Sequence, residues 1–293
     1  MTGDGLIIVD KPGGITSHDV VARVRRLART RRVGHGGTLD PMATGVLVVG
    51  VNKATRLLTY VVGARKGYAA TIRLGQATVT DDAEGEVTAT TDAGGLGKDA
   101  IRAALAAQTG EIDQVPSAVS AIKVNGVRAY KRVRAGERPD LPPRRVTVYD
   151  LAVARVDRPA PGVVDVDVEL TCSSGTYVRA IARDVGEALG VGGHLTALRR
   201  TAVGEFTLVE AATLVDLERR APDVLGLDLA AAARRCLPHR EVSAEEARAL
   251  SHGASLPAMG RTEPYAVFAP DGALVAVVVE RDGRARPEAV FAS

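Results

Sequence analysis

Apolar and polar residues alternate strictly between positions 164 and 172, with valine, leucine or cysteine at the even positions and acidic residues or threonine at the odd ones. A period of two residues predicts a half-buried strand. The same alternation runs from Tyr68 to Leu74, and apolar-rich segments at 6–9, 46–51 and 146–156 predict further strands.

Other segments show the spacing of an amphipathic helix. The apolar stripe of the first is formed by Val20, Val21, Val24, Leu27 and Ala28. Thr16 or Ser17 can cap this helix. Further helices are predicted at 55–62, 98–108 and 178–189. Gly110 and Gly190 lie just beyond the last two and are expected to end them.

The pattern changes near residue 235. A short helix with a Ser243…Glu246 capping box is followed by small strands, and Asp271-Gly272 predicts a hairpin turn. Asn125-Gly126 predicts another hairpin further upstream. The chain is therefore expected to be of the α+β (mixed α/β) class, with a small β-rich module at its C-terminal end.

Composition narrows the range of functions. The two cysteines, Cys172 and Cys236, are far apart, and the five histidines show no metal-ligand spacing, so neither a disulfide framework nor a metal site is expected. No apolar run reaches transmembrane length and the N-terminus is unlike a signal peptide, which predicts a cytoplasmic protein without a membrane anchor.

Positive charge is concentrated in patches, although the net charge of the whole chain is only +3. Six arginines lie between residues 23 and 32, and a proline-containing segment from 128 to 145 carries seven basic residues. Like charges at this density repel one another unless a polyanion neutralises them. The two segments therefore predict contact with a nucleic acid.

Asp40 is the main candidate for chemistry. It lies in the loop Val33 to Gly45, which contains four glycines, and the apolar segment 46–51 follows at once. Glycine lets a backbone approach a ligand closely, and Pro41 biases Asp40 towards an extended conformation. The spacing fits a carboxylate presented at the mouth of a sheet, and it fits an ordinary Asp-Pro turn equally well.

Two further sites could act with Asp40. Tyr68 follows Arg65-Lys66-Gly67, where an exposed aromatic ring could stack on a base, although a half-buried strand residue is the equal alternative. In Thr176 to Arg179 a strand turns into a helix. Because the helix dipole disfavours a cation in the first turn, Arg179 is expected to have a carboxylate partner.

Other chemistries fit the sequence less well. The chain lacks a phosphate-binding P-loop and a Gly-x-Ser-x-Gly nucleophile motif, and Leu39 replaces the third glycine of a dinucleotide fingerprint. A glycoside hydrolase would need a second carboxylate opposite Asp40. Asp81, Asp82 and Glu84 are candidates, but their polar turn is more typical of loop capping.

At these motifs the chain resembles the bacterial tRNA pseudouridine-55 synthases of the TruB type. The matching segments are Asp10-Lys11-Pro12 with Thr16-Ser17, Gly34 to Gly45, Lys66-Gly67-Tyr68, Arg73-Leu74-Gly75 with Thr80-Asp81-Asp82, Pro116-Ser117 with Ser120 to Lys123, Cys172 to Arg179, and Leu198 to Thr201. Together, in this order, the Gly-Gly-Thr-Leu-Asp-Pro and Ser-x-Gly-Thr-Tyr-x-Arg segments are highly specific.

The resemblance implies a pseudouridine synthase fold, with a central mixed sheet flanked by helices in a catalytic domain at 1–235. It also implies a basic, thumb-like arm near 125–145 and a short PUA-like RNA-binding domain at 236–293. The implied activity is the isomerisation of uridine 55 in the T-loop of tRNA, by a monomer that uses neither metal nor cofactor.

The resemblance also assigns roles to individual residues. It makes Asp40 the nucleophile and Arg179 its ionic partner. The residues implied at the flipped-out uridine are His35 against the displaced RNA, Tyr68 stacked on the base, Tyr177 lining the base pocket and assisting proton transfer, and Leu198 packed on the uracil. The residues expected to hold the RNA backbone are Arg23, Arg26, Arg29, Arg31, Lys131, Arg132 and Arg134.

The chain departs from the family pattern at two places. Val119 stands where many relatives carry an aromatic residue, and the C-terminal module is short for a complete PUA barrel. A non-catalytic tRNA-binding or RNA-folding protein is the alternative to the isomerase, and the role of Asp40 distinguishes the two.

Overall fold

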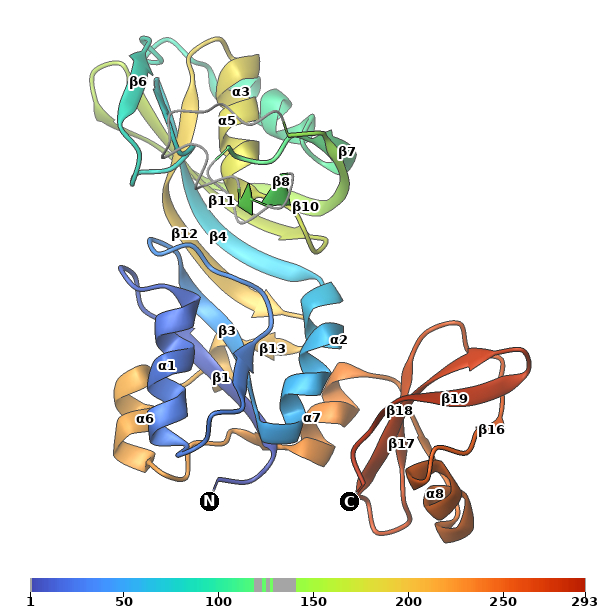
Figure 1. The fold of residues 1–293 in the computed structure, drawn as a ribbon. Helices are drawn as coiled ribbons and strands as arrows, with labels where there is room; N and C mark the ends of the chain where they lie inside the picture. The colour runs from blue at the N-terminus through green and yellow to red at the C-terminus, as the bar shows by residue number, and fades with distance from the viewer. Residues whose placement is uncertain (1, 119–122, 125–126, 129–140, 293) are drawn as a thin grey trace. The chain divides into compact units, whose positions relative to one another are not determined.

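The computed structural model describes residues 2–118, 123–124, 127–128 and 141–292 (Figure 1). The chain divides into two compact units. Unit 1 comprises residues 1–40, 45–63 and 203–293, and unit 2 comprises residues 41–44 and 64–202. Among the described residues, no helix is long and apolar enough to cross a membrane.

A buried antiparallel sheet forms the centre of unit 1. Strand β1 (Gly5–Lys11) lies between β3 (Thr44–Val51) and the short β14 (Leu227–Asp228), and β2 (Val33–His35) also pairs with β3. Nearly every residue of β1 and β3 is buried, as expected from the apolar segments at 6–9 and 46–51. Both predicted strands are confirmed.

Helix α1 (Ser17–Leu27) begins at a capping box. Thr16 Oγ1 accepts a hydrogen bond from Asp19 N at 3.1 Å, and the Asp19 carboxylate accepts one from Thr16 N at 2.8 Å. Thr16 is therefore the cap, and Ser17 is the first helical residue. Burial of Val20, Val21 and Val24 confirms the predicted apolar stripe.

The predicted helix at 55–62 begins earlier, as the 3₁₀ helix η1 (Asn52–Leu57), and continues as α2 (Leu58–Gly63). The later elements of this part of unit 1 are β13 (Phe206–Thr207), η2 (Leu208–Glu210), α6 (Leu214–Arg220) and α7 (Leu229–Cys236). Helices α1 and α6 contact each other, and Figure 1 shows them side by side.

The C-terminal part of unit 1 is a five-stranded sheet with one helix. Its strands, in the order in which they pair, are β15 (His239–Glu241), β17 (Tyr265–Phe268), β18 (Leu274–Arg281), β19 (Arg284–Val290) and β16 (Leu256–Pro257). Helix α8 (Ala244–Ser251) starts at the predicted capping box of Ser243 and Glu246. Gly272, at φ 82°, makes the predicted turn before β18.

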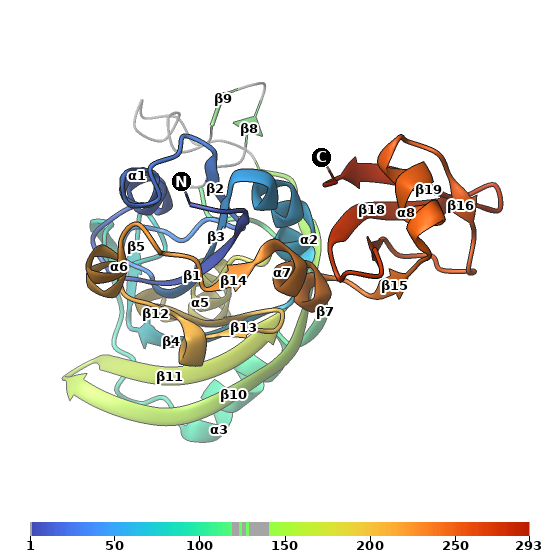
Figure 2. The same cartoon turned by 90° about the horizontal axis from the view of Figure 1, so that it is seen from below.

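Unit 2 contains a second run of strands. Their order is β12 (Gly193–Val203), β4 (Lys66–Leu74), β11 (Val163–Cys172), β10 (Arg144–Ala160) and β7 (Gly110–Gln114). Helices α3 (Lys98–Ala106) and α5 (Val178–Ala188) contact each other, and β5 (Gln76–Thr78) pairs with β6 (Val87–Thr90). Figure 2 shows β10 and β11 running side by side as a long hairpin. Alternating burial along β4 and β11 confirms both period-two predictions.

Further boundaries differ from the sequence prediction in unit 2. Helix α3 ends two residues early, at Ala106, and Gly110 opens β7 instead of directly following the helix. Strand β10 begins at Arg144, so the basic segment expected up to Arg145 ends in a strand. There Arg145 forms ion pairs with acidic side chains of β7, the neighbouring strand, which satisfy its charge locally.

The predicted hairpin near residue 125 is present, because β8 (Lys123–Val124) pairs antiparallel with β9 (Val127–Arg128). Its turn residues Asn125 and Gly126 lie outside the described residues. The same holds for Val119 and for the basic residues Lys131, Arg132, Arg134 and Arg138.

Candidate active site

The loop that carries Asp40 is fixed immediately before the carboxylate. Ser17 Oγ, which is buried, donates to Leu39 O at 3.1 Å and accepts from Leu39 N at 2.9 Å. Both backbone groups of Leu39 are thereby bound to the first residue of α1. Asp40 itself is half-buried.

The chain passes from unit 1 to unit 2 directly after Asp40, since residues 41–44 group with unit 2. In that unit, Arg199 Nη1 of β12 donates to Thr44 Oγ1 at 3.2 Å. The candidate nucleophile therefore lies where the chain leaves unit 1. The backbone is held by hydrogen bonds at Leu39, just before it, and the Thr44 side chain is held by Arg199, just after it.

The glycines of this loop have two different uses. Gly37 and Gly45 adopt φ values of 98° and 100°, which L side chains rarely adopt. Gly34 and Gly36 instead lie against α2: a Cβ on Gly36 would be 2.9 Å from Val61 Cγ1. From the sequence, the glycines were expected to let the loop backbone approach a ligand closely. Gly34 and Gly36 instead allow the loop to pack on a helix.

His35 lies in the same loop and is half-buried. Its ring meets that of the exposed His18 edge to face, with 5.4 Å between ring centroids. Gly36 N next to it donates to Val48 O of β3 at 2.8 Å, and His35 is in register with Val49. His35 is therefore held at the end of a short strand.

In unit 2, the turn before α5 is held by β7 and β10. Ser173 Oγ accepts from Thr147 N at 2.9 Å. Gln114, buried at the end of β7, binds the peptide groups of Tyr177: its Oε1 accepts from Tyr177 N at 2.8 Å and its Nε2 donates to Tyr177 O at 3.1 Å. Sequence reasoning missed Gln114, which carries no local signal of this role.

Arg179, in the first turn of α5, has a carboxylate partner in Asp82, whereas the resemblance names Asp40 as its ionic partner. Its Nη1 lies 3.4 Å from Asp82 Oδ2 and donates to Thr80 O at 2.8 Å. Both side chains of this pair are almost fully buried, 5% and 4% exposed. A buried guanidinium bound on one side in this way has a fixed orientation.

The acidic residues of this turn stabilise the loop; their contacts are not those of a general acid for hydrolysis. Asp82 accepts hydrogen bonds from Thr80 Oγ1 and Glu84 N, so it caps its own turn while it binds Arg179. Burial raises the pKa of Asp81, and Arg183 of α5 lies 3.4 Å from its carboxylate and opposes that effect. This is the loop-capping role that the sequence favoured.

Tyr68 is buried rather than exposed. Only 8% of it is accessible, because it lies on the same face of β4 as the core residues Ala70 and Ile72. The expectation of an exposed aromatic ring is wrong for this arrangement, since the alternation that predicted the strand also places Tyr68 on its inner face. Leu198 of β12 is buried as well.

Two cations near Tyr68 were not singled out from the sequence as buried groups. Lys66, two residues earlier on the same face of β4, is buried, and its Nζ donates to Ala64 O at 3.0 Å. Burial and, to a smaller extent, the charge of Arg200 lower the pKa of Lys66 to about 8. Arg200 is itself only 1% exposed.

The basic segment of α1 and the turn after it is largely accessible, as predicted. Arg26, Arg29 and Arg31 are exposed, and Arg23 is half-buried. Arg25 Nη2 donates to Val33 O at 3.1 Å, which ties the segment to the start of β2. An accessible row of guanidinium groups is what phosphate contacts require.

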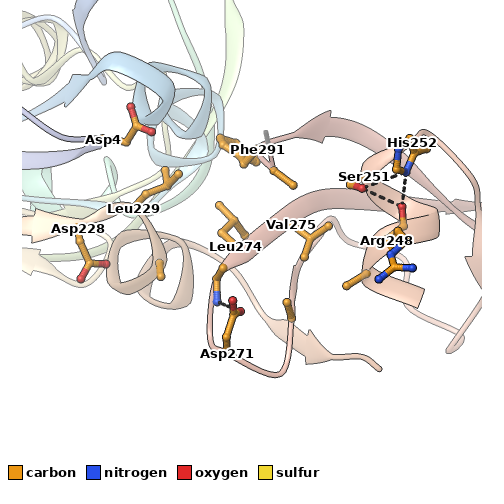
Figure 3. A pocket seen from close by; sticks show the side chains of 15 residues that line it. Asp4, Asp228, Leu229, Arg248, Ser251, His252, Asp271, Leu274, Val275 and Phe291 are labelled. Carbon is orange, nitrogen blue, oxygen red and sulfur yellow. Dashed lines mark hydrogen bonds between the residues drawn. The ribbon is translucent and has the colours of Figure 1, made fainter. Parts of the chain in front are cut away.

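A cavity of about 790 Å³ lies elsewhere in unit 1, lined by residues of α7, α8 and the C-terminal sheet (Figure 3). Its polar lining includes Asp4, Asp228 and His252, and Phe291 forms part of its apolar lining. None of the candidate site residues lines it. Within the described ranges, no group of three or more histidine, cysteine or acidic residues could hold a metal ion.

Known families match almost the whole chain. The model for the TruB family pseudouridylate synthase (N terminal domain) matches residues 25–178. The model for the tRNA pseudouridylate synthase B C-terminal domain matches residues 179–223, and that for tRNA Pseudouridine synthase II, C terminal, matches residues 237–292. The chain belongs to the TruB family.

Individual relatives agree over their full length. A "tRNA pseudouridine synthase B" of Arthrobacter sp. (strain FB24) is 59% identical, with 98% of this chain and 96% of the relative covered. One of Thermobifida fusca (strain YX) is 56% identical, with 99% of both chains covered.

Solved structures show the same fold. A chain of an H/ACA RNP bound to a substrate RNA containing 2'-deoxyuridine has a TM-score of 0.72 at 27% identity, with 99% of this chain and 85% of that chain covered. A chain of an archaeal box H/ACA sRNP Nop10–Cbf5 complex has the same TM-score and identity, with 98% and 86% covered. The predicted α+β pseudouridine synthase fold with a β-rich C-terminal part is confirmed.

Proposed function

We propose that this TruB-family chain converts uridine 55 in the T-loop of tRNA into pseudouridine, with Asp40 as the nucleophile. The observation that carries the proposal is similarity over the full length of the chain to proteins named tRNA pseudouridine synthase B, including 59% identity to the Arthrobacter protein. The loop of Asp40 lies inside the matched N-terminal family region.

The reaction breaks the bond between N1 of uracil and C1′ of ribose and forms a bond between C5 and C1′. The base loses the proton on C5 and gains one on N1, so the composition of the nucleotide is unchanged. No co-reactant is consumed, and we propose that no cofactor or metal takes part. A carboxylate nucleophile such as Asp40 stabilises the intermediate while the base is detached and turned.

The other site residues bind and orient the base. Arg179 keeps the nucleophile ionised, while Tyr68 and Leu198 hold the flipped-out uracil. Tyr177 lines the base pocket and assists proton transfer, and His35 contacts the RNA from which the base has left. Flipping costs a few kcal/mol of lost stacking, which a pocket of matching shape repays.

The basic segments hold the RNA backbone. The proposed contacts are Arg23, Arg26, Arg29, Arg31, Lys131, Arg132 and Arg134. Residues 1–235 form the catalytic domain, with its arm near 125–145, and residues 236–293 form a PUA-like RNA-binding module, supported by the family match at 237–292. The enzyme acts as a monomer in the cytoplasm, where its tRNA substrate is found.

Replacement of one carboxylate oxygen tests the nucleophile. We expect Asp40→Asn to abolish pseudouridine formation in a tRNA transcript while the Kd for tRNA changes less than about threefold, because phosphate contacts dominate the affinity. Pseudouridine is measured by chemical derivatisation and mass spectrometry, and binding by filter retention.

The wild-type chain provides the decisive control. Binding of tRNA with every uridine left unchanged would contradict the enzyme and favour the non-catalytic RNA binder. Release of free uracil would favour hydrolysis. Full activity of Asp40→Asn would remove Asp40 from the mechanism.

A further inference from the structure

The helical stretch formed by η1 and α2 has two faces that contact different segments of the chain. Thr55, Leu58 and Val61 follow one another at intervals of three residues and form one side. Lys53, Arg56 and Tyr60 recur at intervals of three and four and form another. Residues three and four apart share a helix face, so each side can contact a different partner.

The first side supports the loop of Asp40. Leu58 Cδ1 would lie 3.3 Å from a Cβ on Gly34, and Val61 Cγ1 would lie 2.9 Å from a Cβ on Gly36. The backbone of the loop at these two glycines therefore rests directly on the Leu58 and Val61 side chains of α2. A displacement of α2 is transmitted to the loop, because close-packed surfaces do not deform continuously.

The second side holds the end of the C-terminal strand β19. Lys53 Nζ donates to Phe291 O at 2.9 Å, Arg56 Nη1 donates to Val290 O, and Tyr60 OH donates to Glu288 Oε2 at 2.8 Å. The guanidinium of Arg56 also lies over the Phe291 ring, 5.2 Å from its centroid.

Arg234 of α7 also reaches the C-terminal sheet, where it lies over the Phe268 ring, 3.9 Å from the ring centroid, and forms an ion pair with Glu241. Phe291 also lines the cavity of about 790 Å³ beside α7 (Figure 3), so part of the neighbouring junction is open rather than packed. The hydrogen bonds of Lys53, Arg56 and Tyr60 therefore form a separate set of contacts between this helical stretch and the end of the chain. Loss of one of them is expected to loosen the position of α2.

We propose that Tyr60, together with Lys53 and Arg56, is a positioning residue through which β19 holds α2 against the Asp40 loop. The C-terminal module thus sets the placement of the nucleophile as well as contributing surface to the molecule. The proposal relies on the proposed function only for the catalytic role of Asp40.

The variants Tyr60→Phe and Glu288→Ala test this coupling, since the first removes the donor and the second the acceptor of a single hydrogen bond. We expect amide hydrogen exchange of residues 34–40 to become about three- to tenfold faster in both variants, the range of one net hydrogen bond. The single-turnover rate with tRNA at saturating enzyme falls by a similar factor, while the Kd for tRNA stays within about twofold.

Tyr265→Phe is the matched control. It removes the bond from Tyr265 OH to Glu280 inside the C-terminal sheet, at 2.9 Å, and this bond does not involve η1 or α2. We expect its exchange at 34–40 and its turnover to equal those of the wild type. Exchange in β4 of unit 2 serves as the internal reference for global stability.

Exchange changes confined to 52–63 and 284–292, with turnover unchanged, would overturn the proposal. So would an equal effect of Tyr265→Phe on the loop. If the wild type fails to isomerise uridine, the proposed function falls, and exchange of the loop still decides whether the coupling exists.

Discussion

Arg179 combines two features that are each unfavourable for a positively charged side chain. It lies in the first turn of α5, where the helix dipole repels a cation, and it is almost fully buried. Asp82 and the carbonyl of Thr80 offset both costs. A cation held at this expense is more than a surface contact, and its orientation depends on the planar fork of arginine.

Arg179→Lys tests the fork at constant charge. We expect the single-turnover rate of pseudouridine formation to fall at least about tenfold, with the Kd for tRNA nearly unchanged, because a lysine cannot hold Asp82 and a second partner in one plane. Arg183→Lys, one turn further along α5, is the control and should retain most activity. Equal losses in rate and affinity would count against a role at the nucleophile.

Lys66 predicts a pH effect on stability. Burial lowers its pKa to about 8, from an ordinary value of 10.5, so the unfolded chain binds a proton more tightly than the folded one between these limits. The free energy of unfolding should therefore rise with pH from about 8 to 10.5. Below pH 8 the charged, buried form carries the full penalty.

The comparison with Lys66→Met isolates this term from other titrations. We expect the variant to be more stable than the wild type by about 3 kcal/mol at pH 7, and the difference to shrink towards pH 10. Urea denaturation at both pH values measures it. A difference that stays constant with pH would show that Lys66 does not titrate in this range.

At the scale of elements, short-range patterns determined much of what could be predicted. Period-two alternation located β4 and β11, while a cap at Thr16 or Ser17 and the Ser243 capping box located the starts of α1 and α8, because these signals lie within a few residues of each other. The contact of Gln114 with Tyr177 joins residues 63 positions apart, and a single sequence holds no signal for it.

The contact between the loop and α2 gives a prediction at the same scale. Gly36→Ala should lower the free energy of unfolding by about 1 to 3 kcal/mol, since its Cβ would lie 2.9 Å from Val61 Cγ1. Val61→Ala in the same chain should restore part of the loss. Gly63→Ala is the control, because a Cβ there meets nothing within 4 Å. Urea denaturation measures these free energies of unfolding. An unchanged value for Gly36→Ala would contradict the close packing of the loop on α2.

At the scale of the whole molecule, the sequence predicted the class of fold, but not which segments group together. Residues 41–44 group with unit 2 although they adjoin Asp40, and residues 203–293 return to unit 1 after the whole of unit 2. Local propensity does not report such returns, because strand partners such as β1 and β14 are more than 200 positions apart.

This division has a consequence for how the protein is made on the ribosome. Residues 64–202 are contiguous, whereas unit 1 is built from segments on both sides of them, so residues 203–293 join it only after the whole of unit 2 has been translated. The segment that carries Arg179 and Tyr177 is therefore synthesised before β14 and β19, which join the unit that carries Asp40.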